Sequence, residues 1–79
     1  MEKGVMVALG EMVHTLRRRK GWSQHQLAAA IDASPTTVSN IEKGKVSTIH
    51  LGHLLGLAVA LNTSPNALLG WVEEKRSDE

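Results

Sequence analysis

Ser34-Pro35 opens a stretch whose exposed residues can form hydrogen bonds but carry no negative charge. Hydroxyl and amide groups can bond to base edges, and a lysine can pair with a phosphate. A short polar helix face without a carboxylate suits a surface that enters a negatively charged groove. The chemistry predicted here is therefore nucleic-acid recognition, on a face made of Pro35, Thr36, Thr37, Ser39, Asn40 and Lys43.

The sequence gives little support for a metal site, a catalytic site or a phosphate-binding loop. The chain has no cysteine and four histidines, His14, His25, His50 and His53. His50 and His53 could share a helix face, but no clear acidic third ligand stands nearby, so we expect surface histidines and no metal site. No Ser/His/Asp arrangement and no glycine-rich phosphate loop is present. The sequence therefore predicts neither an enzyme nor a cofactor.

Composition sets the scale of the molecule. The 79 residues leave room for one domain, and 42% hydrophobic with 22% charged residues is ordinary for a soluble globular chain. The longest apolar run, Leu54 to Leu61, is far too short to span a bilayer. The N-terminus has no clean apolar stretch, so we expect no signal peptide, no membrane partner and a cytoplasmic protein.

Charge is distributed unevenly along the chain. Residues 1–45 hold seven Lys and Arg against four acids, a net charge of +3. Residues 46–79 hold two against four, a net charge of −2. One end of the chain is thus basic, and the other ends in a mixed, solvated tail.

Hydrophobic spacing predicts helices at the start of the chain. Apolar residues recur at intervals of three and four from residue 5 to 19, which predicts a first helix. Gly21 follows it and ends it. Ser23 and Gln26 can form a capping box for a second helix, which continues to Ile31. Ser34-Pro35 is an N-cap followed by proline, and this third helix runs to Glu42 or Lys43.

Two more helices follow. Ser47 or Thr48 is expected to cap a fourth helix, and Ser64-Pro65 repeats the cap-and-proline start for a fifth. No segment alternates at period two, so we predict no strands. The fold class is all-α, a compact five-helix bundle over residues 5–72 with a solvated tail at 73–79. The fourth helix carries the apolar residues Leu51, Leu54, Leu55, Ala58 and Leu61.

The second and third helices meet the requirements of a helix-turn-helix, two short helices joined by a tight turn. Their packing at a steep angle needs small or aliphatic residues between them, and Ala28 stands where they would approach. In such a unit the second of the two helices enters the major groove. The remaining residues of this wedge are Leu27, Ile31, Ala33, Val38 and Ile41.

Anchored positions across the chain resemble the lambda-repressor-like, or XRE/Cro, helix-turn-helix domain. Leu16-Arg17, then Gly21-Trp22-Ser23-Gln24, Leu27-Ala28 and Val38-Ser39-Asn40-Ile41-Glu42-Lys43-Gly44 follow the family pattern. The similarity covers residues 9 to 70. It implies a compact bundle of about five helices, which agrees with the helices counted from the spacing.

The resemblance also implies roles for single residues. Pro35, Thr36 and Asn40 match positions that reach base edges, where Asn suits adenine and the Thr methyl suits thymine. Arg17 matches an arginine that pairs with the glutamate at Glu42 beneath the DNA-binding surface. Positions close to backbone phosphates are matched by Gln24, Ser34, Ser39, Lys43 and Lys45.

Two residues depart from the family pattern. Asp32 stands where Gly is usual, at a position that tends to need left-handed backbone, which Asp tolerates with some strain. Pro35 stands where a base-contacting Gln is frequent, and proline has no donor for a base. We therefore expect Asp32 to point away from DNA and direct readout to depend on few side chains.

These features predict a sequence-specific DNA-binding transcriptional regulator that occupies a near-palindromic operator as a homodimer and blocks or recruits polymerase, with repressor-like action as the favoured direction. The alternative is a protein-interaction module of the same fold, an antitoxin or coactivator whose partner is a toxin or another regulatory protein. Surplus apolar residues near the C-terminus predict the dimer contact. The interface candidates are Leu57, Leu61, Leu68, Trp71 and Val72.

Overall fold

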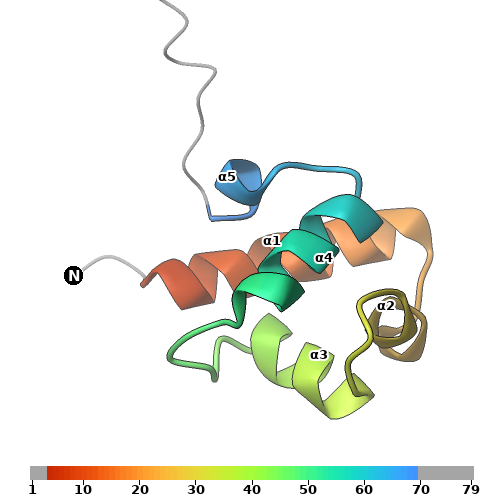
Figure 1. The fold of residues 1–79 in the computed structure, drawn as a ribbon, viewed down its shortest axis with the longest axis horizontal. Coiled ribbons are helices and arrows are strands. Elements are labelled where there is room, and N and C mark those ends of the chain that lie inside the picture. Colours follow the sequence, from red (N-terminus) through yellow and green to blue (C-terminus); the bar gives the residue numbers. More distant parts are fainter. Residues whose placement is uncertain (1–3, 70–79) are drawn as a thin grey trace, which may run out of the picture.

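The structure, a computed structural model, describes residues 4–69, which form five α-helices and their connections (Figure 1). The all-α bundle with a helix-turn-helix predicted from the spacing is confirmed. In Figure 1 α1 crosses the middle of the molecule, with α3 on one side of it and α5 on the other. The helices are α1 (Val5–Lys20), α2 (Gln24–Ala30), α3 (Pro35–Glu42), α4 (Leu51–Ala60) and α5 (Pro65–Leu68).

The predicted helix ends hold in four places. Ser23 accepts from the backbone N–H of Gln26, whose side chain accepts from the Ser23 N–H in return, which is a complete capping box. Ser34 caps α3 and Ser64 caps α5, each followed by proline at the first helical position. α1 ends at Gly21, whose φ of 75° lets its N–H bond back to the last turn.

α4 begins later than predicted. Neither Ser47 nor Thr48 caps it; the N-cap is His50, whose Nδ1 accepts from the Gly52 N–H at 3.0 Å. The connection from α3 instead sends Val46 and Ile49 against the core. Burial of these two aliphatic side chains outweighs the small gain that an earlier hydroxyl cap would bring.

The core is aliphatic and draws on all five helices. α1 packs on α3, α3 packs on α2, and α4 and α5 close the other side of the bundle. Burying each aliphatic side chain contributes about 1.5–3 kcal/mol. The buried hydrophobic residues are Leu9, Val13, Leu27, Ala28, Ile31, Val38, Ile41, Leu57, Ala58, Leu61 and Leu68.

α1 and α3 approach each other most closely at Gly10. A Cβ on this glycine would lie 2.2 Å from the carbonyl oxygen of Ile41 and 2.8 Å from that of Glu42. Both atoms belong to the backbone of α3, so neither can rotate out of the way. The absence of a side chain at Gly10 therefore sets how deeply the last turn of α3 sits against α1.

The apolar residues of α4 divide between the core and solvent. Its buried residues are Leu57 and Ala58, followed by Leu61, so three of the dimer candidates are wrong: Leu57, Leu61 and Leu68 lie in the core and cannot touch a partner. Leu51 and Leu55 are 65% and 46% exposed. Leu55 lies about 100° around the helix from Leu54, at the edge of the buried stripe.

Three predictions lie outside the described residues. Trp71 and Val72, two of the dimer candidates, belong to residues 70–79, as does the tail at 73–79. The boundary of the domain at residue 72 likewise stays a prediction. Within residues 4–69, no helix is both long and apolar enough to cross a membrane.

Candidate nucleic-acid interface

The outer face of α3 carries the residues predicted to reach base edges. Thr36 is exposed, and Pro35 and Asn40 are half-buried at the rim of the same short helix. The one carboxylate of α3, Glu42, has a side chain only 4% exposed and is turned toward α1. The face that α3 presents to solvent is therefore polar and free of negative charge.

The residues predicted to lie near phosphates surround this face. Lys43 and Lys45 follow α3 directly and are exposed, and Ser39 is half-buried on α3. Ser34 already uses its hydroxyl oxygen to accept from the Thr37 N–H at 3.1 Å, so its first role is to cap α3. Each of these phosphate contacts remains a prediction.

Glu42 is bound by side chains from two other helices. Arg17 Nε donates to Glu42 Oε2 at 2.5 Å and Arg17 Nη2 donates to Oε1 at 3.0 Å, so the ion pair predicted from the resemblance is present. Arg17 also donates to the Trp22 carbonyl at 2.8 Å, which ties the pair to the turn before α2. Gln24 Nε2 donates to Glu42 Oε1 at 3.1 Å.

These contacts keep both groups charged. Burial would raise the pKa of Glu42, but the hydrogen bonds from Arg17, His14 and Gln24 and the charge of Arg17 outweigh it, so the pKa lies below its ordinary value. The hydrogen bond to Glu42 raises the pKa of Arg17 against the opposing effect of burial. The Arg17–Glu42 ion pair thus links α1 to the end of α3.

His14 belongs to the same group of side chains, and the sequence assigned it no function. Its Nδ1 lies 3.0 Å from Glu42 Oε1 and 3.2 Å from Arg17 Nη2. We call His14, Arg17, Gln24 and Glu42 the Glu42 cluster. The position of His14, one turn before Arg17 on α1, is the only signal in the sequence that could have placed it here.

An open hollow of about 340 Å³ lies over this cluster. Its walls come from three elements: α1, the first turn of α2, and the end of α3. We call it the His14 hollow, lined by His14, Gln24, Glu42 and Lys43. Two residues that the sequence assigned to phosphates, Gln24 and Lys43, thus face one depression.

The turn into α3 has the predicted backbone. Asp32 has a φ of 58°, in the left-handed region that its position was expected to require, and its side chain is exposed. The Asp32 carboxylate would repel DNA if it pointed toward it. Its expected direction, away from DNA, stays a prediction.

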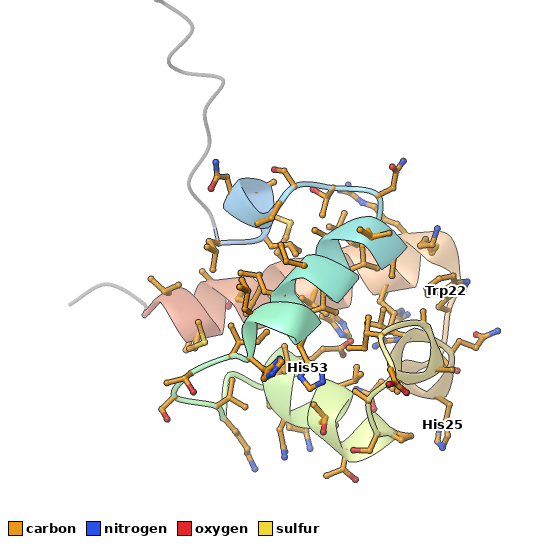
Figure 2. All side chains as sticks on the ribbon, in the orientation of Figure 1. Trp22, His25 and His53 are labelled. Atoms are coloured by element: carbon orange, nitrogen blue, oxygen red, sulfur yellow. The ribbon has the colours of Figure 1, made fainter. Side chains whose placement is uncertain are left out.

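The other histidines and Trp22 lie apart from this hollow. His25 is exposed on α2, whereas His53 lies on α4 with its ring centroid 5.3 Å from that of His50 (Figure 2). In the described part of the chain no group of three or more possible metal ligands comes together. Trp22 packs at the edge of the core, and Lys20 places its Nζ 4.7 Å from the Trp22 ring centroid.

A known protein family and several solved structures are similar to this helix-turn-helix fold. A family model described as a helix-turn-helix domain matches residues 8–69. No curated protein matches the sequence. The restriction-modification controller protein C.AhdI from Aeromonas hydrophila is 33% identical, with a TM-score of 0.73, over 80% of this chain and 94% of that one.

Two further solved structures are similar. The hypothetical transcription factor NHTF from Neisseria is 31% identical with a TM-score of 0.76, over 82% of this chain and 72% of that one. The clp gene regulator ClgR from Corynebacterium glutamicum is 26% identical with a TM-score of 0.81, over 98% of this chain and 81% of that one. All three are described as regulators or transcription factors.

Proposed function

Because this chain belongs to the helix-turn-helix family of DNA-binding regulators, we propose that it represses transcription by occupying a near-palindromic operator as a homodimer. The observation that carries the proposal is the outer face of α3, which is polar and has its only carboxylate held inward by Arg17. A face of this kind can enter the major groove without repelling phosphates. No step of this activity needs a cofactor.

Selection of bound sequences from random duplex DNA tests this function. We expect one enriched motif with two inverted half-sites, because a two-fold dimer places its recognition helices about 34 Å apart. Enrichment without symmetry contradicts the dimer. Failure to retain any duplex at low salt contradicts DNA binding and favours the protein-interaction module.

Base readout on α3 gives the first prediction. Asn40→Ala and Thr36→Ala should each weaken binding to the selected site by about 1–3 kcal/mol and relax preference at particular base pairs. Gln24→Ala serves as the comparison. One amide N–H of Gln24 is held by Glu42, which leaves the second for a phosphate, so its loss should be similar on every sequence.

Titration of selected and scrambled duplexes measures both effects. A residue that reads bases loses affinity mainly on the selected duplex, whereas a phosphate contact loses affinity on both. Equal loss on the two duplexes for Asn40→Ala removes that residue from the readout set.

The dimer contact is best placed on the outer side of α4. Leu51, Leu55 and Val59 follow one another at intervals of four and form one apolar ridge, which we call the α4 stripe. Val59 is 82% exposed. A small soluble domain that leaves such a ridge in water is expected to cover it with a partner. Trp71 and Val72, which lie outside the described residues, stay candidates from the sequence alone.

Charge on the α4 stripe gives the second prediction. Val59→Asp should convert the dimer to a monomer, because a carboxylate would be buried at the interface, while the exposed position spares the fold. Val5→Asp, the same exchange at an exposed position on α1, is the matched control and should leave the dimer intact. Sedimentation at micromolar concentration measures both. A wild-type monomer that stays monomeric on its DNA contradicts the proposal.

A further inference from the structure

We propose that His14 is a DNA-backbone contact that operates only when both of its ring nitrogens carry a proton, closing the His14 hollow over one phosphate together with Lys43 and Gln24. The inference rests on the proposed function and adds a proton-dependent contact to it. Its basis is the placement of His14 Nδ1, which lies 3.0 Å from Glu42 Oε1 and 3.2 Å from Arg17 Nη2.

A neutral imidazole cannot serve this position well in either form. With the proton on Nδ1 the ring donates to Glu42, but Nε2 then turns a lone pair toward an incoming phosphate. With the proton on Nε2 the ring can donate to phosphate and accept from Arg17, but its Nδ1 lone pair then faces the Glu42 carboxylate at 3.0 Å. Each neutral form therefore opposes one anion.

The doubly protonated ring satisfies both anions at once, and it gives up the contact in which Nδ1 accepts from Arg17 Nη2. Its Nδ1–H donates to Glu42, and its Nε2–H, on the opposite edge of the ring, is free to donate to a phosphate oxygen. The His14 side chain is 49% exposed, so this edge is accessible. Lys43 supplies a second positive charge at the rim of the same hollow, and Gln24 supplies a neutral donor.

Of the side chains in the Glu42 cluster, His14 is the one whose protonation changes in this proposal. Glu42 keeps its charge because its pKa lies below the ordinary value, and the pKa of Arg17 is raised. Lys43 faces the hollow from the end of α3, and Glu11 and Arg18 stand one turn away on α1 itself. α5 also packs on α1, and its four residues, Pro65–Leu68, include no ionisable side chain.

The consequence is that DNA binding takes up a proton at His14. Affinity should increase as the pH falls from about 8 to about 5.5, the range in which histidine gains its second proton. One linked proton changes the binding constant by at most tenfold per pH unit. Because phosphate contacts carry no sequence information, the effect should appear on any duplex.

Fluorescence anisotropy with a labelled, mixed-sequence duplex at low salt tests the inference without the operator. The wild-type protein should bind about tenfold more tightly at the acidic end of the range, as expected for a charge-assisted hydrogen bond. His14→Gln should remove most of this dependence while its affinity at high pH stays near wild type. His14→Lys should keep the tight binding at high pH. Thermal melting verifies that each variant is folded.

His25→Gln is the matched control. His25 is exposed on α2 beside Gln24, so it could also sense a phosphate (Figure 2). The inference requires that this variant keep the wild-type pH dependence. If His25→Gln loses the dependence and His14→Gln keeps it, the assignment to His14 is overturned.

The salt dependence separates a direct contact from an effect transmitted through Glu42. A direct phosphate contact adds about 0.9 to the slope of log affinity against log salt, so the wild-type slope should be steeper at low pH by that amount. An unchanged slope overturns the contact. By reciprocity, added duplex should also move the NMR titration of the His14 ring to higher pH.

Failure of the inference is distinguishable from failure of the proposed function. If the wild-type protein binds duplex DNA with the same pH dependence as His14→Gln, only the inference is wrong. If it binds no duplex at any pH, the DNA-binding function is wrong and the inference falls with it.

Discussion

Gly10→Ala should destabilise the domain by about 3 kcal/mol or more, at the upper end of what overpacking costs. The new Cβ would lie 2.2 Å from the Ile41 carbonyl oxygen and 2.8 Å from that of Glu42. Relief requires α1 and α3 to separate, which loosens the packing of Leu9 and Val13, both fully buried. Urea unfolding of the purified domain measures the change.

Gly56→Ala is the matched control because it places the same methyl group inside another helix. There the nearest atoms are the side-chain carbons of Ile31 at 3.4 Å, which is ordinary contact. Replacing a glycine in a helix interior gains up to about 1 kcal/mol of helix propensity. The control should therefore be neutral or stabilising, and a Gly10→Ala domain as stable as wild type contradicts the close approach.

Glu42→Ala should cost about 3–5 kcal/mol, the range for removing one partner of a buried ion pair. The side chains of Arg17 and Glu42 are only 9% and 4% exposed, so Arg17 would keep a charge with little water around it. Gln24 and His14 would lose the same acceptor. Thermal and urea unfolding measure the loss, with Thr15→Ala, at an exposed position on α1, as the control. A surface exchange of that kind usually stays within about 0.5 kcal/mol.

Replacing both partners distinguishes the loss of the Arg17–Glu42 ion pair from the cost of leaving the Arg17 charge buried without a partner. Arg17→Met combined with Glu42→Leu should be less destabilising than Glu42→Ala alone, because no buried charge is left without a partner. If the double variant is the less stable of the two, the large effect of Glu42→Ala does not come from a stranded Arg17.

The same pair predicts an acid dependence of stability. The folded-state pKa of Glu42 lies below its ordinary value of 4.5, so the folded protein holds the ionised form more tightly than the unfolded chain does. Its contribution is complete above that value and is lost as the pH falls through the lowered pKa. Glu42→Ala should therefore lose less stability than wild type on acidification below about pH 4.

Much of this fold follows from local chemistry in the sequence. Ser23, Ser34 and Ser64 precede helices whose starts they cap, and Gly21 ends α1 as its type predicts. The left-handed backbone at Asp32 was likewise predictable. Each of these signals acts over three or four residues, so it can be recognised without knowledge of tertiary contacts.

The features that the sequence did not predict are those that depend on tertiary packing. The inward face of α4 is decided by which leucines meet α5 and α2, and a helix with apolar residues on most sides offers no preference. The meeting of His14 with Glu42, 28 residues away, and the contact at Gly10 are likewise set by how closely α1 approaches α3.

The division of packing among the helices bears on how such a regulator can change over evolutionary time. α3 is supported by α1 and α2, whereas the α4 stripe stands on a helix that packs mainly on α5 and α2. Both helices contact α2, but Thr36 on the outer face of α3 and Val59 on the α4 stripe are exposed, and exchanges at exposed positions usually change stability by no more than about 0.5 kcal/mol. If the chain functions as proposed, a lineage can therefore alter the bases read by α3 while keeping its mode of assembly, or alter assembly while keeping its target. New operator preferences then arise one substitution at a time, without an unfolded or unassembled intermediate.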